Sequence, residues 1–202
     1  MERNSIECLK ADIYRLTKDT SWKSIIKQLI KNKCFRPIFT LRMCQHFDSK
    51  NNKIMLAIFR IMHRNNCDKA GLLMSWKCDI GPGFSLTHTF GSGITDLAKL
   101  GSNITLLHGT SIAQKDSISE KDGSRTSHGA IVGDNVWLGP NSTIVGGVNI
   151  GKSSIVGANT LVSKDVPEES IVVGNPQKVL NKKAIEDVYN KVPKEILGRC
   201  YK

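Results

Sequence analysis

Hydrophobic residues return at two different spacings along this chain of 202 residues. Over residues 5 to about 65 they recur three and four positions apart, as Ile6 and Leu9 illustrate, which is the period of an amphipathic helix. Polar runs at 19–21 and 48–52 interrupt the pattern. The first third of the chain therefore predicts three or four short helices.

Beyond Cys78 the period becomes six, with a large hydrophobic residue at every sixth position and a small or branched residue two positions before it. The large residues are Leu100, Leu106, Ile112, Val132, Leu138, Ile144, Ile150, Val156 and Val162, and their smaller companions are Ala98, Ile104, Thr110, Ala130, Val136, Ser142, Val148, Ser154 and Thr160. Short strands with two inward side chains each, joined by tight turns, close triangular coils of about 18 residues, and stacked coils form a parallel β-helix.

A β-sandwich is the alternative to this β-helix, but its strands would alternate over five or six residues with uneven spacing. Here the six-residue count holds without slippage from 132 to 162. Glycines fall at the expected corners, where a positive φ or a close approach of backbones favours them, at positions Gly133, Gly139, Gly146, Gly151 and Gly157. The predicted organisation is mainly β, with helices over 1–70, the β-helix over 71–180 and a helical tail over 181–202.

Two features depart from the repeat. Twenty positions separate Ile112 from Val132, so about 14 polar residues are predicted to leave the coil as an excursion loop at about 113–129. Toward the N-terminus, Ile80 and Leu86 are assigned to the smaller inward position. This register places His88 where a hydrophobic side chain would otherwise point inward.

Charge and cysteine content narrow the function classes. The net charge is +11, and residues 1–70 hold 15 Lys and Arg against 6 Asp and Glu. No interleaved aromatic residues or zinc-finger spacing accompany this charge, which argues against nucleic acid as a partner. The remaining explanations are a helical face that is simply solvated, or binding to an acidic polymer or to the inner membrane face. The six cysteines form no CxxC pair and no signal-peptide pattern is found, so a reduced cytoplasmic protein is expected. The apolar run 54–59 is too short to cross a bilayer.

Several motifs together carry a family likeness. The repeats, with "NVWLG", "DVPEESIVVGNPQKVL" and "IGPGFSLTH", resemble the hexapeptide-repeat acyltransferases with a left-handed β-helix. Within that family the chain is similar to the serine acetyltransferase-like branch, which includes O-acetyltransferases of capsular and O-antigen polysaccharides. The resemblance implies a left-handed coil, a homotrimer with a hexamer left open, and acetyl-CoA as co-substrate in the groove between neighbouring coils.

Acetyl transfer to a hydroxyl requires a base near that hydroxyl, and a neutral imidazole suits this role. The resemblance implies that His88 is the base. His128 follows Arg125 at the return end of the excursion loop and resembles the second active-site histidine, with Arg125 expected at the substrate. His108 follows His88 by 20 residues, near one coil turn, and is the third catalytic candidate.

The residues around His88 bear on the acceptor. Thr87 stands where serine acetyltransferases carry an Asp, and Leu73 stands where they carry the partner carboxylate of the histidine. Asp19 matches an aspartate that contacts serine in that branch, although an Asp in this position is also typical of a helix cap. The missing partner for an ammonium group favours a neutral sugar hydroxyl. Trp137 resembles an outward tryptophan of sugar O-acetyltransferases, with a subunit interface as the alternative role.

For the cofactor, the resemblance implies that the small residues Gly139, Gly157 and Ala158 let the pantetheine arm approach the coil. Lys164 and Lys178 are expected to meet the nucleotide phosphates. Gln177 replaces the Ala that usually follows "GNP" in the family. No metal is expected, because the histidines lack the HxxxxH pair of the γ-class carbonic anhydrases that share this scaffold.

The leading hypothesis is therefore an acetyl-CoA-dependent O-acetyltransferase that acts on a sugar hydroxyl of a bacterial surface polysaccharide or its precursor. The enzymatic alternative is a serine O-acetyltransferase. The alternative from another class is a non-catalytic β-helix scaffold or binding module.

Overall fold

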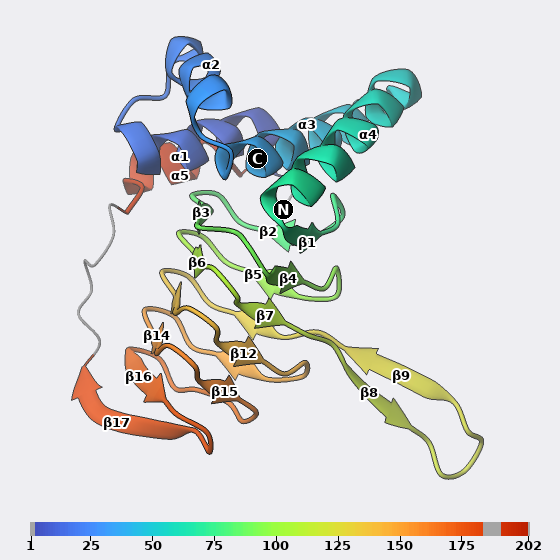
Figure 1. The fold of residues 1–202 in the computed structure, drawn as a ribbon, viewed down its shortest axis with the longest axis vertical. Coiled ribbons are helices and arrows are strands. Elements are labelled where there is room, and N and C mark those ends of the chain that lie inside the picture. The colour runs from blue at the N-terminus through green and yellow to red at the C-terminus, as the bar shows by residue number, and fades with distance from the viewer. Residues whose placement is uncertain (1–2, 184–190, 202) are drawn as a thin grey trace.

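The computed structural model describes residues 3–183 and 191–201, and it shows a layer of helices lying across one end of a β-helix (Figure 1). The helices of the N-terminal layer, as their period predicts, are α1 (Ser5–Thr17), α2 (Trp22–Lys31), α3 (Phe35–Ser49) and α4 (Lys53–Ala70). Within the described ranges, no helix has both the length and the apolar content that a membrane crossing needs.

Polar side chains at the interruptions cap these helices. Ser21 Oγ accepts the N–H of Ser24 at 3.3 Å at the start of α2, and Asn52 Oδ1 accepts the N–H of Met55 at 3.1 Å at the start of α4. Each bond satisfies a backbone donor that the helix itself leaves open. Both breaks in the hydrophobic pattern are thus helix boundaries, and a third boundary, between α2 and α3, has no such break.

The β-helix consists of three parallel sheets that the chain visits in turn. The first sheet holds β1 (Leu72–Met74), β4 (Ser92–Ile94), β7 (Ser111–Ile112), β12 (Thr143–Ile144) and β15 (Leu161–Val162). The second holds β2 (Asp79–Ile80), β5 (Lys99–Leu100), β10 (Ile131–Val132) and β13 (Asn149–Ile150). The third holds β3 (Ser85–Thr87), β6 (Thr105–Leu107), β11 (Trp137–Leu138), β14 (Ile155–Val156) and β16 (Ser170–Val173), with β17 (Lys178–Lys183) antiparallel at its edge.

The predicted inward register from Ala98 to Val162 is confirmed. All of the large and smaller inward residues named from the sequence are buried, the most accessible being Val148 at 6% exposure. Stacked strands align them one above another, as in the pairs Leu106 with Leu138 and Leu138 with Val156. The glycine corners confirm the need for close approach: a Cβ at Gly151 would lie 2.4 Å from the backbone nitrogen of Glu168.

The register predicted for the first coil is wrong. Ile80 pairs with Leu100 and Leu86 with Leu106, so both occupy the large inward position. The cause is a longer corner: eight positions, instead of six, separate Leu86 from the next large inward residue, Ile94. The two extra residues shift the six-residue register of all positions before the corner. His88 lies at that corner and is exposed.

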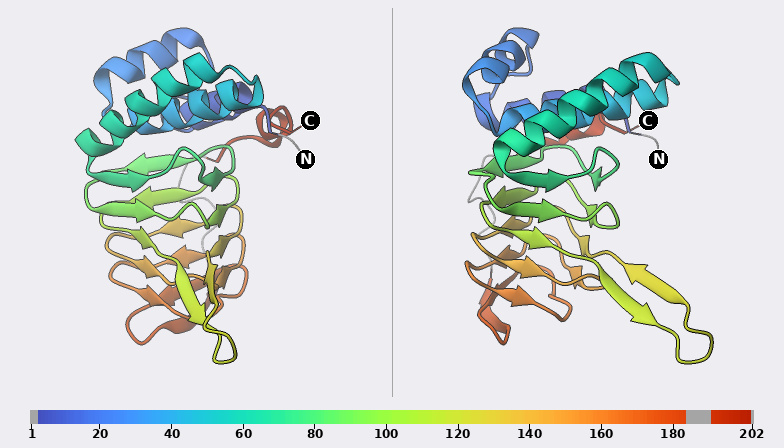
Figure 2. Two further views of the ribbon diagram at one scale, coloured as in Figure 1. Left: turned by 90° about the vertical axis from the view of Figure 1, so that its right-hand side faces the viewer. Right: turned by 45° about the vertical axis from the view of Figure 1, so that its right-hand side comes forward.

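The excursion between β7 and β10 has more order than a loop. It forms an antiparallel hairpin of β8 (Lys115–Ile118) and β9 (Arg125–His128) that projects from the side of the rod (Figure 2). Every residue of both strands is exposed. Because neither face packs on a core, the hairpin lacks the alternation of apolar and polar residues by which strands are predicted.

The C-terminal segment returns to the helical layer. Residues 181–183 of the predicted helical tail belong to β17, residues 184–190 lie outside the described ranges, and the helix described in the tail is α5 (Lys194–Gly198). Val192 and Cys200 pack against Cys8 of α1. The backbone N–H of Asn4 donates to the carbonyl of Cys200 at 2.8 Å.

A buried ion pair joins the helical layer to the first coil, and we call it the joint. Arg42 of α3 is 1% exposed, and its Nε donates to Asp12 Oδ2 at 2.8 Å. Its two terminal nitrogens donate to the carbonyls of Ile80 and Gly81, each at 2.7 Å. Asp12 Oδ1 accepts the N–H of Phe84 at 2.8 Å. The joint therefore satisfies backbone groups of the first coil on the side where no further coil follows.

Replacing Arg42 with Met should remove the cation and leave the Asp12 carboxylate buried alone. We expect the free energy of unfolding, measured by urea denaturation, to fall by about 3–5 kcal/mol, as is typical when one partner of a buried pair is lost. The control is Lys10→Met, which removes a surface pair with Glu7 and should change stability by less than about 1 kcal/mol. A loss no larger than the control's would contradict the role given to the joint.

Candidate functional site

Two of the three candidate catalytic histidines lie side by side. The rings of His88 and His108 meet edge to face, with their centroids 6.3 Å apart and their planes at 78°. Both lie at the corner where third-sheet strands lead into the first sheet, after β3 and β6 respectively (Figure 1). We call this edge, at residues 88–91, 108–110, 139–142 and 157–160, the histidine corner.

The backbone presents His88 to solvent. His88 has φ +55°, in the left-handed region, which turns the chain sharply and directs the side chain away from the interior. The next residue anchors the turn, because the buried hydroxyl of Thr89 donates to the carbonyl of Ala70 at 2.7 Å. In the described part of the chain, neither His88 nor His108 forms a side-chain hydrogen bond, so both rings are open to a substrate.

Small residues continue the histidine corner along the rod. Leu86 pairs with Leu106, Leu106 with Leu138, and Leu138 with Val156. The residues that follow each of these four therefore lie in line along the rod. Gly139, Gly157 and Ala158, which were expected to bind the cofactor, therefore lie below His88 and His108 on one edge. The coil itself also needs these glycines, since a Cβ at Gly139 would lie 2.7 Å from the carbonyl oxygen of Val156.

Trp137 faces outward on the third sheet, as its position between inward neighbours predicts. Val136 and Leu138 are buried, whereas Trp137 is half-buried on the outer surface of β11. Its neighbours on this face are Thr105 and Ile155. The third sheet ends at the histidine corner, two residues beyond Trp137 in this coil.

His128 and Arg125 lie at a different corner from His88. They belong to β9, in the hairpin that connects the first sheet to the second. Arg125 pairs with Asp116 of β8, and together with the Ser127 hydroxyl it lowers the pKa of Asp116 to about 2. His128 lines a cavity of about 380 Å³ that also includes Lys99. Within one chain, the structure does not bring His128 to His88.

Asp19 supports the start of α2, but the capping residue of this helix is Ser21. The Asp19 carboxylate accepts the N–H of Ser21 at 2.9 Å and the hydroxyls of Ser21 and Ser24 at 2.5 and 2.6 Å. These hydrogen bonds hold the pKa of the exposed Asp19 at about 2. The capping alternative for Asp19 is therefore wrong: its carboxylate holds Ser21, and the Ser21 hydroxyl oxygen accepts the N–H of Ser24 at 3.3 Å. A role of Asp19 at the substrate stays a prediction.

Lys164 and Lys178 lie toward the end of the rod that carries β17. Gln177 links their segments, because its Oε1 accepts the N–H of Lys164 at 2.9 Å and its Nε2 donates to the Lys164 carbonyl at 3.1 Å. The Gln found in place of the usual Ala thus fixes the backbone that carries Lys164. Binding of phosphates by these lysines stays a prediction.

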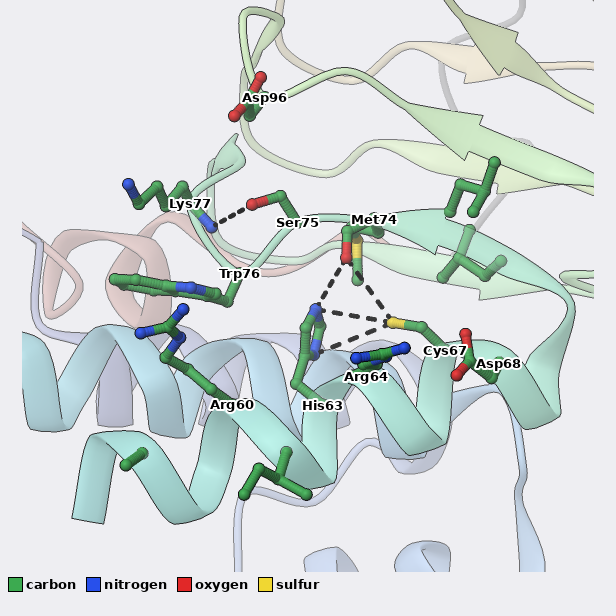
Figure 3. A pocket seen from close by; sticks show the side chains of 14 residues that line it. Arg60, His63, Arg64, Cys67, Asp68, Met74, Ser75, Trp76, Lys77 and Asp96 are labelled. Atoms are coloured by element: carbon green, nitrogen blue, oxygen red, sulfur yellow. Dashed lines mark hydrogen bonds between the residues drawn. The ribbon is translucent and has the colours of Figure 1, made fainter. Parts of the chain in front are cut away.

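A larger cavity of about 750 Å³ lies between α4 and β1 (Figure 3), and none of the described residues that line it belongs to the histidine corner. His63 lines it, but Thr40 and the Met74 carbonyl each hold one ring nitrogen at 3.0 Å, and burial lowers its pKa. Burial likewise raises the pKa of Cys67 to about 12, which leaves a protonated thiol. The titratable groups at the back of this cavity are therefore structural. Within residues 3–183 and 191–201, no cluster of three or more His, Cys, Asp or Glu is arranged to hold a metal ion.

Comparisons with known proteins agree with this architecture. Residues 129–164 match the model for bacterial transferase hexapeptide repeats. The match therefore covers the part of the β-helix from β10 to β15. The chain is 37% identical over 101 residues to serine acetyltransferase 4 of Arabidopsis thaliana, which covers 50% of this chain and 27% of that protein.

Solved structures extend the likeness to the helical layer. The crystal structure of serine acetyltransferase from Neisseria gonorrhoeae superimposes with a TM-score of 0.67 and 25% identity, covering 88% of this chain and 66% of that one. A serine acetyltransferase in complex with CoA gives a TM-score of 0.66 at 20% identity, with 88% and 70% covered. The fold is thus that of serine acetyltransferases, while the match spans about a quarter of the Arabidopsis protein.

Sequence reasoning missed the residues that support the site. Asp12 and Arg42 look like the polar face of surface helices, and Thr89 looks like an ordinary turn residue. A signal existed only at the corner, where eight positions replace six between Leu86 and Ile94. An insertion in an otherwise strict repeat marks a site worth examining.

The left-handed backbone of His88 predicts how substitutions there affect stability. His88→Val should lower the free energy of unfolding by about 1–2 kcal/mol, because a β-branched residue is poorly accommodated at φ +55°. His88→Asn should stay within about 0.5 kcal/mol, since Asn tolerates this region. The matched control His108→Val, at an exposed position without positive φ, should also change little in thermal unfolding. Equal losses at the two positions would contradict the strain at His88.

Proposed function

We propose that the chain is an O-acetyltransferase that uses acetyl-CoA and has His88 as its general base. The single observation that carries this proposal is the exposed imidazole of His88 beside His108, on an edge continued by Gly139, Gly157 and Ala158. The hexapeptide-repeat likeness and the serine acetyltransferase fold support it.

In the proposed reaction, His88 accepts the proton of the acceptor hydroxyl as its oxygen attacks the thioester carbonyl of acetyl-CoA. The tetrahedral intermediate then expels the CoA thiolate, which takes the proton back from His88, so the products are the acetyl ester and CoA. Positioned proton transfer of this kind contributes about 10² to 10⁴ in rate. His108 lies within reach of the same reactants and is assigned to positioning them.

Acetyl-CoA as the donor is supported by the serine acetyltransferase solved with CoA, which shares the fold. The edge below His88 suits an extended pantetheine arm, because the exposed Ala158 has only a methyl side chain there, while Gly139 and Gly157 let neighbouring coils pack closely. Lys164 and Lys178 lie farther along the rod and supply positive charge for the nucleotide phosphates.

For the acceptor, the comparisons favour L-serine over the sugar hydroxyl that was preferred from sequence, because the relatives reported above are named as serine acetyltransferases. The polysaccharide acceptor has no support from them. One observation keeps a neutral hydroxyl as the second candidate: the exposed residue beside His88 is the uncharged Thr87. Serine binding without an Asp there requires another partner for the ammonium group.

We also propose that the working unit is a homotrimer. His88 and His128 occupy different corners of one chain, and the hairpin that carries His128 projects from the rod (Figure 2). A neighbouring copy that presents its hairpin to the histidine corner would complete the site with Arg125 and His128. The exposed Leu73 and Ile61, at 77% and 65%, would be covered in such an assembly.

Replacing His88 with Asn should reduce kcat by about 10² to 10⁴ while leaving stability unchanged. Loss of the acetyl-CoA thioester absorbance measures turnover without interference from the free cysteines. Calorimetry should show that His88→Asn still binds acetyl-CoA. Full activity in this variant would refute His88 as the base, and absence of acetyl-CoA binding in the unmodified protein would favour a scaffold.

The acceptor is tested by changing the charge next to His88. Thr87→Asp should raise kcat/KM for L-serine by up to about fivefold, because an exposed ion pair with the ammonium group is worth at most roughly 1 kcal/mol. The control is Thr87→Asn, because Asn has the size of Asp without its charge. This variant should leave the preference between L-serine and an uncharged sugar unchanged. If neither acceptor is acetylated by the unmodified protein, the proposed acceptor classes are wrong.

A further inference from the structure

Helix α2 carries an apolar stripe that nothing in the described chain covers. Trp22, Ile26 and Ile30 are 49%, 57% and 71% exposed. Residues four apart lie close together on a helix surface, so the three side chains form one continuous ridge along α2. An exposed ridge of this size on a helix end of the molecule marks a contact surface.

A row of lysines runs beside this ridge. Lys23, Lys27 and Lys31 are exposed and again recur every four residues, one position after each apolar residue. Trp22–Lys31 contains no acidic residue, and Lys33 follows directly as another exposed cation. The outward half of α2 is therefore apolar along one side and uniformly positive along the next.

The helix is held firmly enough to present both rows. Ile25 is completely buried against the core, and Leu29 packs beside it. Arg36 of α3 donates to the carbonyls of Leu29 and Ile30 at 2.8 and 2.9 Å, which fixes the last turn. α2 stands at the outer end of the molecule, opposite β17, where a broad surface can reach it (Figures 1 and 2).

The exposed stripe on α4 has a different setting. Ile54, Ile58 and Ile61 are 76%, 47% and 65% exposed, and with Leu73 of β1 this surface continues onto the side of the rod. Contact with another copy would cover it. On α2, by contrast, an apolar ridge that could insert into another phase lies beside a row of lysines, and both stand at the end of the rod.

From these features we infer that α2 docks on an anionic lipid surface, with the apolar ridge at the acyl boundary and the lysines at the phosphates. Helices that lie in a membrane interface have an apolar face with Trp and a polar face rich in Lys. Lysine stems extend along apolar surface and carry the ammonium group to the headgroups. The inference stands independently of the acetyl transfer proposed above.

Co-sedimentation of the full chain with phospholipid vesicles tests this surface. The protein should sediment with vesicles of phosphatidylcholine and phosphatidylglycerol, and much less with phosphatidylcholine alone or in high salt. Lys23→Gln/Lys27→Gln/Lys31→Gln should weaken binding on the order of 100-fold. The matched control Lys50→Gln/Lys53→Gln/Lys69→Gln removes the same charge from the residue after α3 and from α4, and it should bind far more tightly. Equal losses in the two triple variants would overturn the inference in favour of nonspecific attraction.

Insertion of the ridge is tested separately with brominated acyl chains, which quench a tryptophan only when its ring enters the lipid. Quenching should occur with the unmodified protein and disappear in Trp22→Phe, which retains Trp76 and Trp137. Ile26→Ser/Ile30→Ser should weaken vesicle binding at least about tenfold with an unchanged circular dichroism spectrum. Absence of quenching, or loss of self-association instead of vesicle binding in the double variant, would overturn the lipid assignment.

Discussion

The buried pair of Arg42 and Asp12 is the constraint on which the position of the site depends. A parallel β-helix pairs each coil with the next, so its first coil has backbone groups without a coil to pair with. Arg42 donates hydrogen bonds to the carbonyls of Ile80 and Gly81, and Asp12 accepts one from the N–H of Phe84. Arg15, also buried, donates one further hydrogen bond to the Gly83 carbonyl at 2.8 Å. The first coil is thereby fixed as firmly as the coils below it.

This closure matters because His88 belongs to that first coil. Phe84 and Gly83 directly precede β3, which ends at Thr87, so the joint holds the strand that delivers the imidazole. Thr89 holds the other side of the turn through the Ala70 carbonyl. A single positive φ between two anchored segments then suffices to direct His88 outward, beside His108 of the next coil.

The extent to which sequence predicted the structure follows from how each signal arises. The six-residue period predicted which side chains point inward, because the same spacing repeats over many coils. A deviation at one position does not hide the repeat. It failed at Ile80 and Leu86 because the longer corner at 88–91 lies between them and the repeats that were counted. The hairpin at 115–128 was missed because exposed strands carry no apolar alternation. Arg42 was missed because its buried side chain donates to backbone carbonyls that are distant in sequence. From the sequence alone, such an arginine cannot be distinguished from one on the surface.

The basic excess of the N-terminal region has more than one physical cause. Arg15 and Arg42 are buried and serve as donors to the first coil, and Arg36 spans the last carbonyls of α2. These three cations would be required whatever the protein binds, so net charge alone overstates the attraction to an anionic partner. The lysines of α2 are different, because they are exposed in a row beside an uncovered apolar ridge. The arrangement of these residues, rather than their number, separates a structural role from a surface that has a partner.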